Sequence, residues 1–268
     1  YYRKDYGDSI RDEVVLSVKK VSVPGILNDV SFELHRGEIL GFGGLSESGM
    51  HEIGKAVFGA SYDRSGSVVL ADGTQINDIP TAIANSIAYT SKDRDNESVV
   101  MNQSIGDNIC LPSLDKLTSK WKFLSDRAMN DFANEYAKKM SVKMVNTEQF
   151  VSDLSGGNKQ KVVLARWIGK DSDIVVLDSP TRGIDIKVKQ DIYNLMNHMI
   201  KNGKSIIMIS EELMELIGMC DRIIIMKDGK ISGEIDRSVE IGENTLISMM
   251  GITVISTYLQ LRLIPLDL

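Results

Sequence analysis

The sequence predicts an α/β protein, with a mostly parallel core sheet, an antiparallel β-subdomain and a helical subdomain. In the last third, short and fully apolar runs alternate with amphipathic helical segments, which is typical of parallel strands joined by crossover helices. The first third instead mixes short β-type runs with one glycine-rich turn. The chain has 268 residues, 43% apolar and 25% charged, so it is long enough to bury the core of one large or two small domains.

Composition excludes several classes of protein. The net charge is −6, so there is no general basic surface for a phosphate backbone, and no nucleic-acid partner is expected. The two cysteines, Cys110 and Cys220, lie far apart and are expected to be reduced, buried thiols. No apolar stretch approaches the ~20 residues of a membrane helix, and no secretory signal opens the chain. Because it begins without Met, we expect a piece of a longer protein.

The first third is expected to hold a linker, four strands and one helix. Residues 1–12 are charged and without periodicity, as a linker would be. A glycine-rich turn at 43–49 precedes helical spacing of Ile53, Val57 and Phe58. The expected strands are Val14–Val18, Val30–Leu34, Ile39–Phe42 and Ser67–Leu70.

Two helical stripes and three buried strands are expected further along. One stripe, in a helical subdomain at about 105–170, consists of Met129, Phe132, Ala133, Tyr136, Ala137 and Met140. The other consists of Val188, Ile192, Leu195, Met196 and Met199, and Gly203 ends its helix. The buried strands are Ile174–Leu177, Ile206–Ile209 and Ile223–Met226. The tail, residues 252–268, has an unclear role: an edge strand, a swapped arm and a cloning artefact all remain open.

The strongest motif is the run Leu154-Ser155-Gly156-Gly157-Asn158-Lys159-Gln160-Lys161, directly before a helical segment. A serine and two glycines at a helix N-terminus present a hydroxyl and backbone N–H groups to a phosphate. Serine is also a common helix N-cap, so this run alone would not establish a phosphate site.

A second motif follows about seventeen residues later. Asp178 ends a buried apolar strand, where a nucleotide-bound Mg²⁺ would be held, and the segment Ser179–Asp185 comes next. Because the two motifs follow one another in this order, a carboxylate that only caps a turn is the weaker interpretation of Asp178.

Together these residues resemble ATP-binding-cassette (ABC) ATPases, and within them the second cassette of ribose/galactose/xylose-type sugar importers. The resemblance covers about residues 13–251. It rests on the LSGGNKQK run at 154–161 and on Gly37–Gly41, Lys92–Arg94, Pro180–Asp185, Ile209–Leu213, Asp221–Ile223 and Asp228–Lys230.

The resemblance implies a P-loop NTPase core, ATP and Mg²⁺ as cofactors, and a place in an ATP-hydrolysing translocase. Two cassettes would face head to tail, each ATP lying between the Walker loops of one and the signature of the other. The signature segment, Leu154–Asn158, would then serve the first cassette of the same full-length chain. Asp178 would be the Walker B aspartate that holds Mg²⁺, and Asp185, also a candidate helix N-cap, would lie in the D-loop at the same interface.

The resemblance also implies membrane permease subunits as partners, and a peripheral location at the cytoplasmic face of the membrane. Residues 92–103 and the outer surface of the helix that carries the first stripe are the positions expected to contact them.

The phosphate loop, residues 44–51, departs from the family pattern G-x-x-x-x-G-K-[ST]. The position of the lysine is Met50, which brings no charge to the phosphates, and the Mg²⁺-binding hydroxyl is replaced by His51. Glu47 adds a negative charge, and two unit charges ~4 Å apart interact by about 4 kcal/mol at an effective dielectric of roughly 20. The whole loop reads Gly44, Leu45, Ser46, Glu47, Ser48, Gly49, Met50 and His51.

Two further positions lose catalytic groups. Ser179 stands where such ATPases carry a glutamate as general base, and Glu211 stands where they carry a histidine. The site on this domain's own Walker loops is therefore expected to be hydrolytically inactive.

Three alternatives remain beside the importer cassette. One is a non-catalytic structural or regulatory module that binds partners without nucleotide, against which the intact signature segment argues. A soluble ABC ATPase of DNA repair or translation would need basic surfaces or coiled-coil insertions, which are absent from this sequence. An autonomous homodimeric ATPase is disfavoured by Met50 and Ser179.

Overall fold

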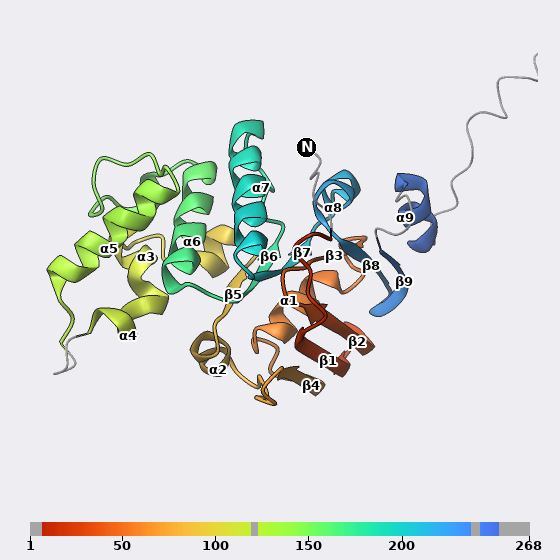
Figure 1. Cartoon of the computed structure of the whole chain (residues 1–268). Helices are drawn as coiled ribbons and strands as arrows, with labels where there is room; N and C mark the ends of the chain where they lie inside the picture. The colour runs from red at the N-terminus through yellow and green to blue at the C-terminus, as the bar shows by residue number, and fades with distance from the viewer. Residues whose placement is uncertain (1–6, 119–122, 237–241, 252–268) are drawn as a thin grey trace, which may run out of the picture.

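The computed structural model describes residues 7–118, 123–236 and 242–251. Its core is a six-stranded sheet, which runs through the middle of the molecule (Figure 1). The strand order is β5-β6-β7-β3-β8-β9; β9 is antiparallel to β8, and the other neighbouring pairs are parallel. The predicted mostly parallel α/β sheet is confirmed. The strands are β3 (Ile39–Gly44), β5 (Ile87–Thr90), β6 (Ile174–Asp178), β7 (Ser205–Ile209), β8 (Arg222–Lys227) and β9 (Lys230–Asp236).

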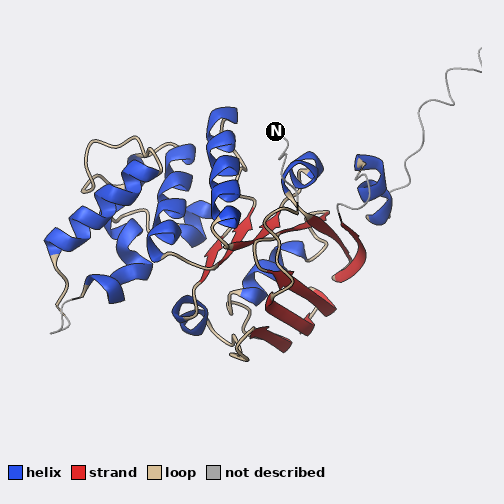
Figure 2. Cartoon of the chain, viewed as in Figure 1, coloured by secondary structure: helices blue, strands red, loops and turns tan. Residues whose placement is uncertain are grey.

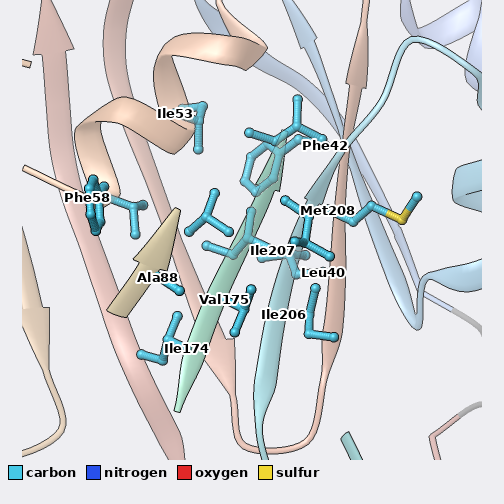
Figure 3. Packing of buried hydrophobic residues seen from close by; sticks show 14 of the residues in the cluster. Leu40, Phe42, Ile53, Phe58, Ala88, Ile174, Val175, Ile206, Ile207 and Met208 are labelled. Carbon is cyan, nitrogen blue, oxygen red and sulfur yellow. The ribbon is translucent and has the colours of Figure 1, made fainter. Parts of the chain in front are cut away.

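The three central strands are buried along their whole length. Every residue of β3, β6 and β7 is buried, which explains why these strands are continuous apolar runs rather than alternating ones. Helix α1 (Met50–Val57) lies across them and places Ile53 over the sheet (Figure 3). Gly54 permits this close approach, since a Cβ there would be 3.0 Å from Cδ1 of Ile209.

A second, antiparallel sheet has the order β2-β1-β4. It confirms the predicted antiparallel β-subdomain of the first third. Its strands are longer than the predicted runs, and β1 continues past Val18 through a register irregularity near Lys20, whose φ is 50°. The strands are β1 (Val14–Val23), β2 (Leu27–His35) and β4 (Ser65–Leu70).

The helices gather largely on one side of the molecule, as Figure 2 shows. Both predicted stripes face the core: Ala133 and Ala137 of α5 (Asp126–Lys139) and Ile192 and Met196 of α7 (Ile186–Lys201) are buried. The other described helices are α2 (Ile79–Ala84), α3 (Ile105–Cys110), α4 (Leu114–Leu117), α6 (Gly156–Lys170), α8 (Leu213–Met219) and α9 (Glu243–Met249), with short helical turns at Arg94–Ser98, Leu111–Ser113 and Val151–Asp153.

A buried arginine attaches α6 to the neighbouring helical segments. Arg166 donates from Nε to the carbonyl of Asn108 at 2.6 Å, from Nη1 to the carbonyl of Ser98 at 2.6 Å, and from Nη2 to Oδ1 of Asn108 at 2.9 Å. Burial lowers the pKa of Arg166 to about 10, so the side chain stays cationic at neutral pH. These three hydrogen bonds fix the orientation of the helix that carries the signature segment.

The described part of the predicted linker is hydrogen-bonded to the body of the domain. The amide of Gly7 donates to Oδ1 of Asp221 at 2.8 Å, and Oγ of Ser9 donates to the carbonyl of Gly37 at 2.8 Å. Both cysteines are buried thiols, as predicted. The tail, 252–268, lies outside the described residues. Among the described helices, none combines the length and the apolar character needed to cross a bilayer.

Candidate functional site

The phosphate loop joins the end of β3 to the start of α1. Gly49 has a φ of 90°, and a Cβ there would be 2.7 Å from the carbonyl oxygen of Ile26, so the turn requires glycine. Leu45, Ser46 and Glu47 are exposed at the tip of the loop. The predicted strand–loop–helix arrangement is therefore present.

The side chain at the lysine position is turned into the core. Met50 is 0% exposed and belongs to the main hydrophobic cluster. The amide of Ser48 donates to the carbonyl of Leu45 at 2.8 Å, so this N–H group of the loop already has a partner. The loop thus offers a phosphate neither a lysine nor the amide of Ser48.

His51 bridges two carboxylates, that of Asp178, which ends β6, and that of Glu211, which follows β7. Its Nδ1 lies 2.7 Å from Oδ1 of Asp178, and its Nε2 lies 3.2 Å from Oε1 of Glu211. Asp178 is 2% exposed, so its carboxylate depends on protein donors. With one ring nitrogen beside each carboxylate, the imidazole of His51 links the end of β6 to the loop after β7.

Glu211 has two further polar neighbours. Oγ of Ser46 donates to Oε1 of Glu211 at 2.8 Å, and Nζ of Lys92 lies 3.5 Å from the same oxygen. The hydrogen bond from Ser46 is the main cause that lowers the pKa of Glu211, and His51 and Lys92 lower it further. The exposed tip of the phosphate loop is thereby tied to the loop after β7.

Ser179 provides no general base at the position where one is expected. Its Oγ donates to Oδ1 of Asp178 at 3.2 Å, and its φ of 50° places the residue in the left-handed region. A hydroxyl cannot take a proton from water at neutral pH as a glutamate does.

The donors around Asp178 do not fit a Mg²⁺-bound nucleotide. Its carboxylate is engaged by an imidazole and a hydroxyl, and position 51 has no hydroxyl ligand for a hard cation. Within the described ranges, no group of three or more His, Cys, Asp or Glu side chains could hold a metal ion.

A cavity of about 690 Å³ beside the phosphate loop is also unfavourable for an anion. Three carboxylates line it, those of Glu47, Asp63 and Asp228, and no lysine or arginine is among its described lining residues. A triphosphate there would meet repulsion without a compensating charge.

The signature segment forms the N-terminus of α6 and has the predicted capping geometry. Oγ of Ser155 accepts from the amide of Asn158 at 3.4 Å, and Gly156 and Gly157 are the first two residues of the helix. Oδ1 of Asn158 accepts from the amide of Lys143 at 2.9 Å, and Leu154 is buried. Amides in the first turn of a helix have no intrahelical partner, so they are available to an anion.

Asp185 begins the next helix close to the signature segment. Its Oδ1 accepts from the amide of Val188 at 3.0 Å, which confirms the helix N-cap. A Cβ built on Gly157 would lie 3.9 Å from Oδ2 of Asp185. The structure therefore brings the D-loop and the signature segment together on one face, and the phosphate loop, Asp178 and Glu211 together in a separate cluster.

A buried carboxylate beside the D-loop could not be recognised from the sequence. Glu215 is 6% exposed and accepts hydrogen bonds from three hydroxyl groups. Oη of Tyr193 and Oγ of Ser210 each lie 2.6 Å away, and Thr181 of the D-loop also donates. Burial and the hydrogen bond to Glu215 raise the pKa of Tyr193 above its usual range. A single glutamate in an acidic helical segment gives no sequence signal for this role.

The sequence of this chain is similar to those of known ATP-binding proteins. A family model described as "ABC transporter" matches residues 27–182. The ribose import ATP-binding protein RbsA of Clostridium perfringens is 40% identical over 249 residues, which are 92% of this chain and 50% of that protein. The xylose import ATP-binding protein XylG of Thermoanaerobacter pseudethanolicus is 42% identical over 231 residues, 83% of this chain and 46% of that protein. The chain spans about half the length of these curated relatives.

Solved structures share the fold. The dimeric structure of a bacterial ABC transporter cassette superposes with a TM-score of 0.72 at 21% identity, covering 85% of this chain and 99% of that chain. A nucleotide-free ATP-binding cassette from an ABC transporter also has a TM-score of 0.72, at 18% identity, and covers 89% of this chain and 96% of that chain.

Proposed function

Because this chain belongs to the ABC transporter family of ATP-binding cassettes, we propose that it is the ATP-binding domain of a membrane importer for sugars. In this proposal it donates its signature segment to ATP that is held on the Walker loops of a second cassette. The relatives named above are import proteins for ribose and xylose, which supports a sugar as the transported solute.

The proposal rests on one contrast between two parts of the domain. The signature segment has its full motif and an N-cap, whereas the phosphate loop lacks the side chains that would bind a triphosphate and Mg²⁺. Ser155, Gly156 and Gly157 present a hydroxyl and first-turn amides at one face. In the phosphate loop, the side chain of Met50 is buried, and His51 stands at the position where a hydroxyl group would bind Mg²⁺. A domain built this way contributes to ATP turnover from its signature face and does not hydrolyse ATP on its own loop.

This proposal implies two kinds of partner, a first cassette and membrane permease subunits. The first cassette of a longer chain would supply the ATP that faces the signature segment, and this domain spans about half the length of its relatives. Permease subunits would anchor the assembly at the cytoplasmic face of the membrane. A cavity of about 430 Å³ on the helical subdomain includes the half-exposed ring of Phe150 and the carboxylates of Asp107, Asp126 and Glu148. These suit a permease segment with apolar and basic side chains.

The substitution Gly156→Asp in the full-length protein tests the proposal. Aspartate would place a negative charge where the γ-phosphate is expected, so transport-coupled ATP hydrolysis should be lost. Gly242→Asp is the matched control, because Gly242 is an exposed N-cap with a φ of −97°, and aspartate is a favourable N-cap. Unchanged turnover in Gly156→Asp would overturn the proposal and favour a partner-binding module that uses no nucleotide.

A further inference from the structure

The guanidinium of Arg94 lies directly against the first residue of the signature helix. A Cβ built on Gly156 would be 3.1 Å from Nη2 and 3.9 Å from Cζ of Arg94. Arg94 begins the short helical turn Arg94–Ser98, which follows β5, so it reaches α6 from a distant part of the sequence. Glycine at 156 leaves room for this contact.

The hydrogen-bonding groups of Arg94 are poorly satisfied by the protein. Nη1 reaches Oε1 of Gln160 only at 3.5 Å, and Nε lies 3.7 Å from Oδ1 of Asp95. Nε is buried and has no hydrogen-bond partner among the described residues. The side chain is 17% exposed, and a guanidinium has five N–H groups to satisfy. Buried donors without acceptors are rare, which indicates a missing acceptor.

Electrostatics indicate that this acceptor is an anion. The N-terminus of α6 has a partial positive charge, and cations are usually stabilised at the opposite end of a helix. Arg94 and the amides of Gly156 and Gly157 therefore bring positive charge to the same place, and a negatively charged group in contact with them would stabilise this arrangement.

There is open space at the guanidinium for such a group. A cavity of about 440 Å³ is lined by Arg94 together with Lys92 and Arg182. Asp93 and Asp95 also line it, but their carboxylates already have partners. Asp93 accepts from Nδ2 of Asn96 at 2.9 Å, and Asp95 lies 3.5 Å from Nζ of Lys159.

We propose that Arg94 belongs to the signature face and donates to the phosphate groups of the ATP that a second cassette presents there. This inference rests on the proposed function, because it requires ATP at the signature segment. It adds a side chain from outside the LSGGN run, one that recognises the triphosphate by charge.

The test uses the full-length two-cassette protein assembled with its membrane subunits, and measures ATP hydrolysis against ATP concentration. Arg94→Gln should raise the KM for ATP about tenfold with a smaller change in kcat, because a charge-assisted contact to bound ATP is lost. Arg94→Lys should recover most of the KM, since it keeps the charge. Arg11→Gln is the matched control, because the exposed Arg11 guanidinium donates to the backbone carbonyls of Asp8 and Ile10.

The outcomes separate this inference from the proposed function. If Gly156→Asp abolishes turnover but Arg94→Gln leaves the KM unchanged, the role of Arg94 is wrong and the signature role stands. If Arg94→Lys matches the wild type in melting temperature yet fails to restore the KM, the role of its charge is likewise overturned. If Gly156→Asp leaves turnover intact, both proposals fail.

Discussion

Nδ1 of His51 lies 2.7 Å from Oδ1 of Asp178, so a side chain on the first turn of α1 holds the carboxylate that ends β6. The other ring nitrogen lies 3.2 Å from Glu211, after β7. In a P-loop NTPase this gap is where Mg²⁺ and the γ-phosphate meet their ligands. Here an imidazole lies between the two carboxylates, so a protein side chain occupies this position.

The His51 bridge should contribute to folding stability. In His51→Ala the buried carboxylate of Asp178 would lose its closest partner, and we expect the free energy of unfolding to fall by about 1–3 kcal/mol. Urea denaturation of the chain measures this. His198→Ala is the control, since His198 is exposed on α7. A loss no greater than that of the control would show that the bridge contributes nothing.

The phosphate loop should add a pH-dependent component to stability through Glu211. The hydrogen bond from Ser46 and the neighbouring His51 and Lys92 lower the folded-state pKa of this carboxyl. A lowered pKa gives stability that is present above the unfolded pKa and is lost as pH falls through the folded value. Glu211→Gln should therefore be less stable than the wild type at neutral pH, and the difference should shrink in acid. A difference constant from neutral to acid pH would contradict this.

The hydroxyl cluster around Glu215 should stabilise the D-loop region. Tyr193→Phe removes a 2.6 Å hydrogen bond to a buried carboxylate and should cost about 1–3 kcal/mol of unfolding free energy. Tyr62→Phe makes the same chemical change on a ring that is 92% exposed and should be nearly neutral. Equal midpoints for the two variants would refute the stabilising role of this cluster.

Much of the fold could be predicted because its strands and helices follow from patterns among residues that are close together in the chain. The strands β3, β6 and β7 are buried on both faces and so appear as unbroken apolar runs, while α5 and α7 bury stripes at helical spacing. The glycines of the phosphate loop could be recognised because the tight turn there needs them. The start of α6 could be recognised because serine is a common N-cap.

The contacts that decide the chemistry could not be predicted, because they join residues far apart in the chain. His51 reaches Asp178 across 127 positions, and Glu215 gathers donors from three separate segments. The sequence shows that lysine is missing at Met50, but only packing shows that this side chain lies in the core. Similarly, Arg94 follows a strand, and nothing local places it against Gly156.

We propose that this domain's own phosphate loop does not bind Mg²⁺-ATP. Isothermal titration calorimetry of the purified chain with Mg²⁺-ATP, up to millimolar concentration, tests it most directly. Because Met50 is buried, His51 contacts Asp178 and Glu211, and carboxylates line the adjacent cavity, we expect no heat beyond that of dilution. Saturable binding with a micromolar Kd would contradict it, and would mean that the loop's backbone amides hold the nucleotide without a lysine.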